Sequence, residues 1–371
     1  MAPATVDVPI TDITAAAFTI PTDYPEADGT IAWNSTTLVL VRAKAGDVSG
    51  IGYSYADVAT AQFVTERLAG IAAGRDANAT SAAWDAMVRS VRNLGGSGLA
   101  AMAISAVDNA LWDLKARLLE IPLYRLLGPL RTAVPVYGSG GFTSYPIDRL
   151  REQLSRWVQD GIPRVKMKVG TDPSSDVARV EAAREAIGPE AELFVDANGA
   201  YSRKQALAKA ERFLDSGVSW FEEPVHQKDV AGLRLLRDRA PAGMDIAAGE
   251  YGYTLTDFRV LLEAGAVDVL QADATRCGGI TGFLRAAALC AAFDLPLSAH
   301  TAPSLHAHVC CAVPNLRHLE YFHDHVRIEQ MLFDGGPTLA GGELHPDPTR
   351  PGLGLELRRD VATRYLVYGS I

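Results

Sequence analysis

Six side chains that can take part in acid–base or metal chemistry each end a short apolar run in the second half of this sequence. They are Asp196, Glu222, Glu250, Asp273, His300 and Glu320, and Lys168 precedes them. Successive members are 20 to 28 residues apart. One strand, one helix and two loops of a parallel α/β barrel take about that many residues. The spacing predicts one active site, built from groups at the ends of successive strands.

Three of these groups, Asp196, Glu222 and Glu250, stand on consecutive predicted strand ends. Converging carboxylates repel one another unless a cation lies between them. Ligation by oxygen atoms alone fits Mg²⁺, with Mn²⁺ as the alternative, and Asn198 offers a further oxygen. A single acid at such a position more often caps the next helix. Three in consecutive units, beside lysine and histidine, favour a metal site.

Lys166 and Lys168 lie two residues apart on a predicted strand, so their side chains point to the same side. An ammonium group beside a metal ion and a second ammonium has a lowered pKa, which suits a general base. The alternative is an exposed pair of charges at a strand end. Their place on the strand before Asp196 favours a role as general base over an exposed pair of charges.

Asp273 and His300 end neighbouring predicted strands, and Glu320 ends the next. A carboxylate on one imidazole nitrogen fixes the tautomer and raises the basicity of the other nitrogen. A lone histidine at a strand end is usually structural, but the preceding aspartate favours a second base. Glu320 is placed to hydrogen-bond the substrate or a developing enediolate, and its alternative role is a salt-bridged barrel acid.

The elements around these groups divide the chain into an α+β part (1–130), a (β/α) barrel (131–335) and a Gly- and Pro-rich tail (336–371). Eight strand-like runs alternate with amphipathic segments in the barrel part, as a parallel sheet requires. They are 133–139, 164–169, 192–196, 218–221, 244–248, 267–271, 295–299 and 316–320. The first part reads as antiparallel strands at 35–46 and 48–56 followed by helices, the clearest at 99–120.

Residues 18–35 show neither strand nor helix periodicity, so we expect a long loop that covers the barrel mouth as a lid. The alternative is a solvent-facing connection. Tyr24, Trp33 and Tyr53 are the substrate contacts expected from this region, and Tyr137 and His323 those expected from the barrel.

Composition limits the classes of function. The 371 residues are 48% hydrophobic, which allows a large folded core, and the net charge of −9 argues against nucleic acid as a partner. The four cysteines form no CxxC pair, which indicates reduced thiols in the cytoplasm. The sequence predicts neither a secretory signal nor a membrane span.

These motifs together resemble the enolase superfamily, specifically its mandelate racemase subgroup. The resemblance rests on Lys166-Met167-Lys168, Asp196-Ala197-Asn198, Glu222-Glu223-Pro224, Gly249-Glu250, Asp273, His300 and Glu320. It covers almost the whole chain. It implies an α/β fold with a TIM-type (β/α) barrel and an α+β capping domain, formed by the N-terminal segment and the C-terminal tail.

The resemblance also implies roles for individual residues. Asp196, Glu222 and Glu250 would be the Mg²⁺ ligands. Lys168 would be the base on one face of a carboxylate substrate, with Lys166 near the substrate carboxylate. His300, paired with Asp273, would be the acid or base on the other face, and Glu320 a hydrogen-bond donor. The shared step is removal of the proton alpha to a carboxylate, and sites of this superfamily pair a lysine or histidine base with Mg²⁺ at the enediolate.

The reaction expected from this set is dehydration of a sugar acid, an aldonate or aldarate, to a 2-keto-3-deoxy acid. Racemisation or epimerisation of a 2-hydroxy acid and cycloisomerisation of a sugar-acid lactone are alternative reactions. A non-catalytic binding protein is a remote alternative, because every expected catalytic group is present. Relatives of this kind also lead us to expect a homo-oligomer, either a dimer or an octamer.

Overall fold

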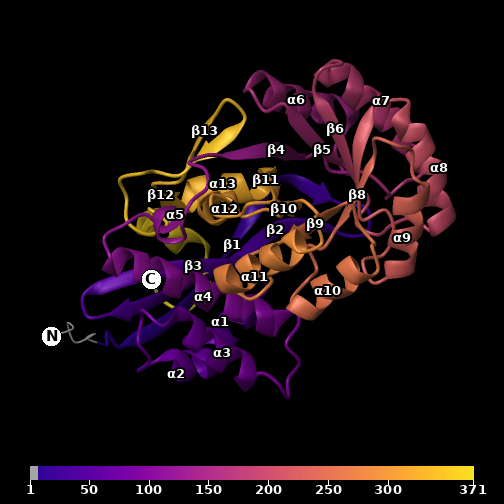
Figure 1. Ribbon diagram of the computed structural model, residues 1–371. Helices are drawn as coiled ribbons and strands as arrows, with labels where there is room; N and C mark the ends of the chain where they lie inside the picture. The colour runs from indigo at the N-terminus through magenta and orange to yellow at the C-terminus, as the bar shows by residue number, and fades with distance from the viewer. Residues whose placement is uncertain (1–6) are drawn as a thin grey trace.

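Eight parallel strands form a closed barrel in the computed structural model, which describes residues 7–371 (Figure 1). The strands follow chain order, and the last pairs with the first, with Leu319 beside Val136. They are β4 (Val134–Gly140), β5 (Arg164–Lys168), β6 (Glu192–Asp196), β7 (Val218–Glu222), β8 (Asp245–Ala248), β9 (Val269–Ala272), β10 (Leu297–Ala299) and β11 (Leu316–Phe322). Each strand overlaps one of the eight predicted runs, so the predicted TIM-type barrel is confirmed.

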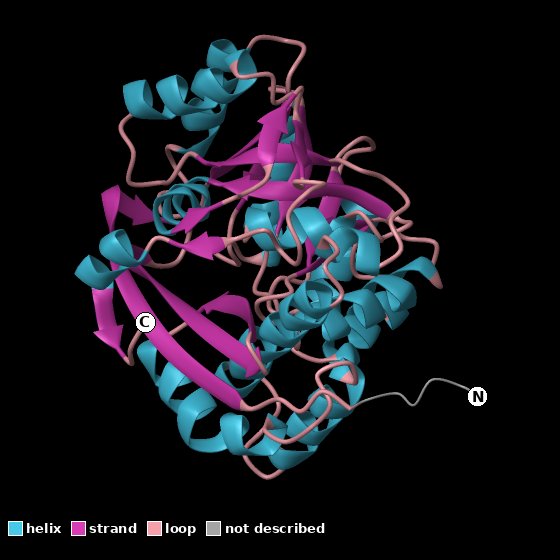
Figure 2. Ribbon diagram, turned by 90° about the vertical axis from the view of Figure 1, so that its left-hand side faces the viewer, coloured by secondary structure: helices cyan, strands magenta, loops and turns pink. Residues whose placement is uncertain are grey.

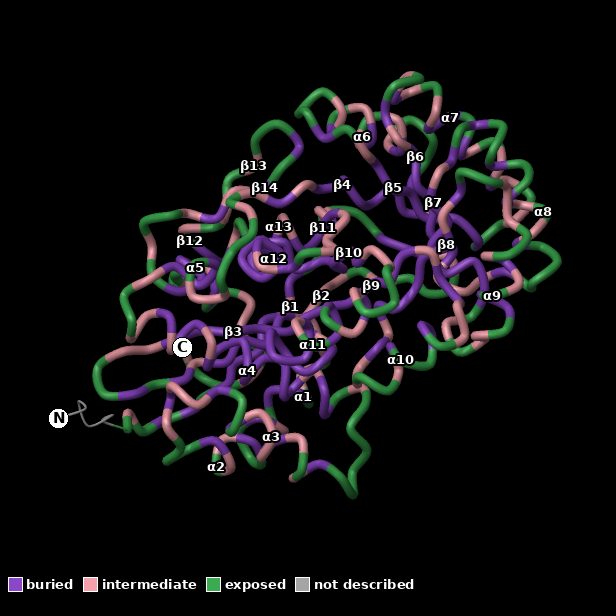
Figure 3. The backbone as a smooth tube through the Cα atoms, viewed as in Figure 1, coloured by how far each residue is buried: buried purple, intermediate pink, exposed green. Residues whose placement is uncertain are grey.

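Helices surround the barrel, and each packs against it with a buried face, except that α12 is buried along its whole length. They are α6 (Ile147–Gln159), α7 (Asp176–Ile187), α8 (Arg203–Leu214), α9 (Val230–Arg239), α10 (Leu255–Glu263), α11 (Gly279–Ala291), α12 (Pro303–Cys310) and α13 (His323–Leu332). In α6 the buried face is Leu150, Leu154 and Trp157, at the spacing of one helical stripe. Figure 3 shows buried barrel strands inside a rim of exposed helical surface. Within residues 7–371 no helix is long and apolar enough to cross a membrane.

An antiparallel sheet forms the cap, as predicted from the sequence, and Figure 2 shows its long strands with helices beside them. Its strand order is β16 (Leu366–Tyr368), β1 (Asp12–Ala27), β2 (Ala32–Ala45) and β3 (Val48–Tyr55). The cap helices are α1 (Val58–Phe63), α2 (Ala69–Ala72), α3 (Thr80–Ser90) and α4 (Leu99–Leu118), with a π-helical turn at Val64–Leu68 and a short α5 (Leu123–Leu126).

Helix α4 lies directly on β3 and joins the cap to the barrel. Gly50 and Gly52 of β3 allow this approach, because a Cβ atom at Gly52 would collide with the backbone of Ala110. On the barrel side, Asn109 Oδ1 accepts a hydrogen bond from the Ile280 amide at 3.0 Å. Ser105 Oγ accepts one from the Gly278 amide at 2.9 Å. The buried polar face of α4 therefore fixes the cap on the start of α11.

The prediction of a long loop at 18–35 is wrong. This segment forms the outer arms of the β1–β2 hairpin, which turns at 28–31. The pairing register shifts between Pro21 and Glu26, so the hairpin carries a bulge. Beyond Phe18, where its pairing with β16 ends, β1 pairs with β2 alone and is an edge strand. An edge strand and a bulge both tolerate proline and break the alternation of buried and exposed residues.

The tail returns to both parts of the molecule. Strands β13 (Thr338–Ala340) and β14 (Glu343–His345) extend the sheet beside β4, and β12 (Phe333–Asp334) pairs with β15 (Glu356–Leu357). After α14 (Arg359–Ala362) and a 3₁₀ turn at Thr363–Tyr365, β16 joins the cap sheet. The division at 130 and 335 stays a prediction, and residues 1–6 of its first part lie outside the described residues.

The contact between α4 and β3 gives a test of the cap. Gly52→Ala is expected to lower the free energy of unfolding by about 1–3 kcal/mol, the usual effect of overpacking, because the added methyl group meets the α4 backbone. Gly70→Ala is the matched control, since nothing lies within 4 Å of its Cβ position in α2. We expect the control to leave stability unchanged or slightly raised. Equal thermal unfolding midpoints for the two variants would contradict the close packing.

Candidate active site

The carboxyl ends of the barrel strands bring the predicted groups together at one mouth. Lys168 ends β5 beside Asp196, which ends β6 beside Glu222 at the end of β7. Glu250 follows β8, Asp273 follows β9, His300 follows β10, and Glu320 lies within β11. Parallel pairing puts strand ends on one edge, so residues far apart in the chain meet there.

The Asp196, Glu222 and Glu250 side chains converge, with one carboxylate oxygen from each within 4.8 Å of the others. All three are buried, and burial followed by the charge of Asp196 raises the pKa of Glu222 well above its ordinary value. Within the described part of the chain, Glu250 Oε2 and Asn198 Oδ1 have no hydrogen-bond partner. Buried oxygens without donors fit a hard cation, so this donor set can hold Mg²⁺.

Glu223 was not assigned a role from the sequence, yet it lies at the same mouth. It is fully buried and has a positive φ of 37°. Neither of its carboxylate oxygens finds a partner among the described residues. Burial, and then the Glu250 carboxylate, raises the pKa of Glu223 well above its ordinary value. Its position directly after Glu222 in the motif Glu222-Glu223-Pro224 was the signal that could have identified it.

Two lysines on β5 counter this negative charge at different depths. Lys166 is fully buried, and its Nζ lies 2.5 Å from Glu222 Oε1 and 2.8 Å from Glu320 Oε1. Lys168 lies nearer the mouth, where its ammonium donates to Asp196. Burial acts to lower the pKa of Lys168, but the Asp196 carboxylate outweighs it and raises the pKa above its ordinary value. The lowered pKa expected for a lysine beside a bound metal ion and a second ammonium stays a prediction.

His300 and Asp273 form a hydrogen-bonded pair. His300 Nδ1 lies 2.8 Å from Asp273 Oδ2, while Asp273 Oδ1 accepts hydrogen bonds from the Thr275 amide and hydroxyl at 2.6 and 2.7 Å. Burial acts to raise the pKa of Asp273, but the hydrogen bond and charge of His300 hold it well below its ordinary value. The ionised Asp273 fixes the His300 tautomer, which leaves Nε2 at the mouth, 3.3 Å from Glu250 Oε2.

Glu320 completes the set from β11. Its Oε1 accepts a hydrogen bond from Ser139 Oγ at 2.5 Å, and its Oε2 accepts one from the Thr301 amide at 3.2 Å. Burial acts to raise the pKa of Glu320, but Lys166 outweighs it and lowers the pKa to about 2. Both Glu320 oxygens thus accept hydrogen bonds from the protein, and the donor role that the resemblance implied stays a prediction.

A cavity of about 400 Å³ lies between this mouth and the cap. The barrel contributes Lys168, Asn198, Glu250, His300 and Glu320 to its wall. The cap contributes Asp28, Ile31, Trp33 and Tyr55, so the hairpin that replaces the expected loop still covers the site.

Three further cavity residues were not predicted as site residues. Arg276 follows Asp273 by three positions, and its Nη1 lies 3.3 Å from Glu250 Oε1. Tyr55 stacks on His325 with ring centroids 3.3 Å apart and planes at 8°. The spacing of Arg276 from Asp273 was a usable signal. The stacked pair joins residues of the cap and of α13, so the sequence offered no local pattern for it.

Of the five predicted substrate contacts, Trp33 lies in the cavity wall and the other four lie elsewhere. Tyr24 packs edge-on against Tyr145 and is 36% exposed. Tyr137 is fully buried inside the barrel, where it packs against Phe194. His323 pairs with Asp23 on the outer part of the hairpin.

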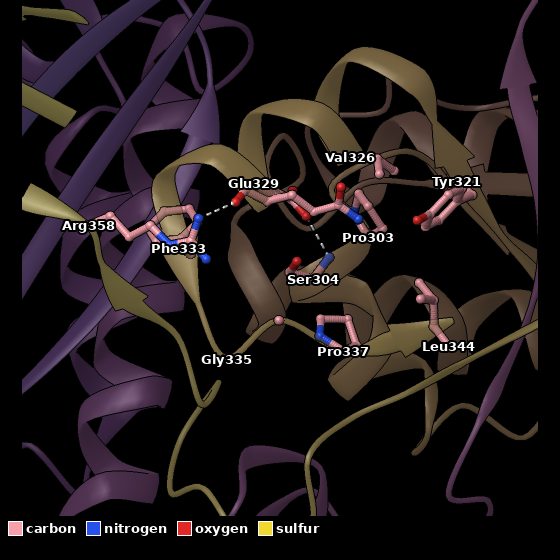
Figure 4. Close-up of a pocket in the computed structure, with 12 residues that line it drawn as sticks. Pro303, Ser304, Tyr321, Val326, Glu329, Phe333, Gly335, Pro337, Leu344 and Arg358 are labelled. Carbon is pink, nitrogen blue, oxygen red and sulfur yellow. Dashed lines mark hydrogen bonds between the residues drawn. The ribbon is translucent and has the colours of Figure 1, made fainter. Parts of the chain in front are cut away.

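The fourth, Tyr53, is fully buried and bonds Glu329, which lines a separate pocket of about 240 Å³ between α12, α13 and the tail. Its hydroxyl donates to Glu329 Oε1 at 2.8 Å, while the Ser304 amide donates to Glu329 Oε2 at 2.8 Å. Figure 4 shows Glu329 and Ser304 in the wall of this pocket. Tyr53 thus holds Glu329 by a hydrogen bond and does not line the active-site cavity.

Comparison with known proteins matches both parts of the chain to one family. Residues 10–128 match the mandelate racemase / muconate lactonizing enzyme N-terminal domain, and residues 149–361 match the enolase C-terminal domain-like family. The chain belongs to the mandelate racemase/muconate lactonizing enzyme family. The resemblance drawn from the sequence is therefore confirmed, and the protein is an enzyme of the lyase or isomerase type found in this family.

Three relatives are particularly informative. A mandelate racemase/muconate lactonizing enzyme-like protein from Rubrobacter xylanophilus is 57% identical, with a TM-score of 0.95 over 97% of this chain and 100% of the relative. The 3,6-anhydro-alpha-L-galactonate cycloisomerase of Streptomyces coelicolor is 35% identical over 86% of this chain and 89% of the relative.

The third relative is the L-talarate/galactarate dehydratase of Salmonella typhimurium, 34% identical over 85% of this chain and 79% of the relative. A crystal structure of that dehydratase, with Mg and L-lyxarohydroxamate, superposes with a TM-score of 0.89 at 28% identity, over 100% of this chain and 96% of the relative. Magnesium is thus the metal seen in this family, in agreement with the oxygen donors of the carboxylate triad.

The triad gives a direct test of metal binding. Glu222→Gln is expected to weaken Mg²⁺ binding at least tenfold, because a neutral amide replaces one buried anionic donor. Titration calorimetry measures the affinity, and circular dichroism checks that the fold is kept. Glu190→Gln, at an exposed position, is the matched control and should bind as the wild type does. Equal affinities for the two variants would exclude the triad as the metal site.

Proposed function

We propose that this enzyme removes the proton alpha to the carboxylate of a sugar acid and eliminates water, which yields a 2-keto-3-deoxy acid. The observation that carries the proposal is the pair of candidate bases, Lys168 and the His300–Asp273 dyad. Lys168 and His300 line one cavity from the ends of non-neighbouring strands, β5 and β10, and the strands of the carboxylate triad lie between them. Aldonates and aldarates are the substrates that we propose.

The proposed reaction assigns one task to each group. One base takes the C2 proton, which leaves the electron pair on the substrate as an enediolate. The other, in its protonated form, gives a proton to the C3 hydroxyl, so that water leaves and the resulting enol tautomerises to the keto acid. His300 suits the acid role, because Asp273 holds Nδ1 and stabilises the imidazolium.

The remaining residues orient the substrate and balance its charge. A divalent cation held by Asp196, Glu222 and Glu250, Mg²⁺ or alternatively Mn²⁺, supplies stabilisation of the negative charge that grows on the substrate carboxylate. Lys166 is fixed by Glu222 and Glu320 beside that position and adds a buried positive charge. Glu320 is placed to accept a hydrogen bond from a substrate hydroxyl at the cavity wall.

The experiment that tests this function is a panel of aldonates and aldarates incubated with Mg²⁺. Production of a 2-keto-3-deoxy acid, detected as its semicarbazone and by NMR, supports dehydration. Loss of activity in excess chelator and its return with Mg²⁺ are expected as well. Turnover of the same substrate by metal-free protein would contradict the proposal.

Cycloisomerisation is the second candidate, because a 35% identical relative is a cycloisomerase. The same panel, extended to sugar-acid lactones and anhydro sugar acids, separates the two reactions by their products. A ring-opened or rearranged isomer of unchanged mass indicates cycloisomerisation, whereas loss of water indicates dehydration. Racemisation or epimerisation changes neither mass nor connectivity and is recognised by optical rotation.

The two candidate bases are expected to be separable in D₂O. Lys168→Ala should lose solvent exchange of the C2 proton in one substrate configuration and His300→Asn in the other, since each base faces one side of the substrate. Proton NMR measures the exchange, and a loss of about 10²–10⁴-fold is expected for a positioned acid–base group.

Asp273→Asn should reproduce the defect of His300→Asn, because the amide holds the imidazole less firmly and does not stabilise its charged form. Lys204→Ala, at an exposed position in α8, is the control for the lysine variant and should keep wild-type exchange. Wild-type exchange in both Lys168→Ala and His300→Asn would show that neither residue is the base.

Two expectations about the protein as a whole are part of the proposal. A homo-oligomer, dimer or octamer, is checked by light scattering of the purified enzyme. Residence in the cytoplasm agrees with the four buried, unlinked cysteines and is checked by cell fractionation.

A further inference from the structure

A second group of potential metal ligands lies apart from the carboxylate triad, between the hairpin and the barrel. It consists of Asp23 and Glu26 on β1 and His323 at the start of α13. One potential ligand atom from each residue lies within 4.8 Å of the others. His323 Nε2 is 3.1 Å from Asp23 Oδ1 and 3.2 Å from Asp23 Oδ2.

Glu26 distinguishes this group from an ordinary surface ion pair. Its side chain has no exposed surface, and its Oε2 accepts a hydrogen bond from Trp33 Nε1 at 2.8 Å. Its Oε1 is buried without a hydrogen-bond partner in residues 7–371. Burial, and then the charge of Asp324, raises the pKa of Glu26 to about 9. A buried carboxylate of this kind needs a positive partner to keep its charge.

The charged side chains around the group do not cancel one another. Asp324 is fully buried next to the group and bonds Arg327 at 2.6 Å. Arg149 Nη2 lies 3.3 Å from Asp23 Oδ2. Three carboxyl groups thus face two guanidinium groups, so the ionised cluster keeps an excess of negative charge.

We propose that Asp23, Glu26 and His323 bind a divalent transition-metal ion, with Zn²⁺ as the best fit. One imidazole nitrogen and two carboxylates suit Zn²⁺ better than Mg²⁺, which prefers oxygen donors alone. Ligand bonds of about 2.0–2.2 Å place neighbouring tetrahedral ligand atoms about 3.4 Å apart. The distance between Asp23 and His323 is already close to that value, and Glu26 approaches through a small side-chain movement.

The proposed ion joins the cap to the barrel at the edge of the active-site cavity. Asp23 lies in the bulge of β1, between Pro21 and Glu26, whereas His323 directly follows β11, the strand that carries Glu320. Glu26 also holds Trp33, which lies in the cavity wall. The metal would therefore fix the outer arm of the hairpin and the indole ring that faces the substrate.

Zinc stoichiometry tests the site. Metal-free protein is equilibrated with buffered free Zn²⁺, and bound zinc per chain is measured by atomic emission. The wild type is expected to hold two ions, one at the triad and one at the proposed site. Glu222→Gln and His323→Asn should each hold one, and the double variant none. Glu26→Gln should also hold one, and circular dichroism checks each fold.

His226→Asn is the matched control, since His226 is exposed and lies in a barrel loop away from the group. It should keep two ions. Added Zn²⁺ should raise the thermal midpoint of Glu222→Gln, and this shift should disappear when His323→Asn is added. A zinc content that neither Glu26→Gln nor His323→Asn lowers relative to the wild type overturns the proposal. Failure of the triad is seen separately, as equal zinc content in the wild type and Glu222→Gln.

Discussion

The burial of several carboxyl groups at one barrel mouth is the constraint on which the rest of this structure depends. Asp196, Glu222 and Glu320 are all removed from water, and an unpaired ion in such a place costs several kcal/mol. Lys166 lies within 3.4 Å of an oxygen of each of the three and offsets much of this cost. That contact requires the neighbouring strands β5, β6 and β7 to end in register on one edge, as their pairing shows. The closed barrel is therefore the arrangement in which these charges can be both buried and paired.

The cap does more than cover this mouth, because it also holds one of the candidate bases in place. Ser54 Oγ donates to the Thr275 carbonyl at 2.7 Å, and Asn109 Nδ2 donates to the Ala274 carbonyl at 3.1 Å. These carbonyls belong to the turn directly after Asp273, whose carboxylate orients His300. The position of the imidazole thus depends on contacts across the boundary between cap and barrel, so a change in cap docking would affect both the cavity shape and the acid–base group.

The barrel and its strand-end groups could be predicted from the sequence because they obey a local rule. Each strand is a short apolar run that ends in a polar residue, and the helical segments between them repeat every three to four positions. The hairpin at 18–35 could not be predicted in this way, because the bulge and the edge position of β1 interrupt alternation. Tyr53 was misplaced for a different reason. Tyr53 and its neighbour Tyr55, two residues away on the same strand, both donate to Glu329 Oε1, but only Tyr55 also lines the cavity. Glu329 is 276 residues distant from Tyr53 in the chain, so no local pattern revealed this contact.

The two sides of the cavity divide the chemistry between them. The barrel side carries the acid–base and metal-binding side chains Lys168, Glu250 and His300, which removal of an alpha proton in this site would use. The cap side offers the acidic Asp28 together with Ile31, Trp33 and Tyr55, which carry no charge at neutral pH. These residues face the strand-end groups across the cavity, where they would contact the part of a substrate away from its carboxylate. Burial and the charge of Glu329 raise the pKa of Tyr55, and burial lowers the pKa of its stacking partner His325, so both stay neutral. Neutral hydroxyl and imidazole groups can donate to and accept from the hydroxyls of the proposed sugar-acid substrate. Which bond breaks after proton removal would then depend on how the cap residues and His325 orient the C3 substituent towards His300.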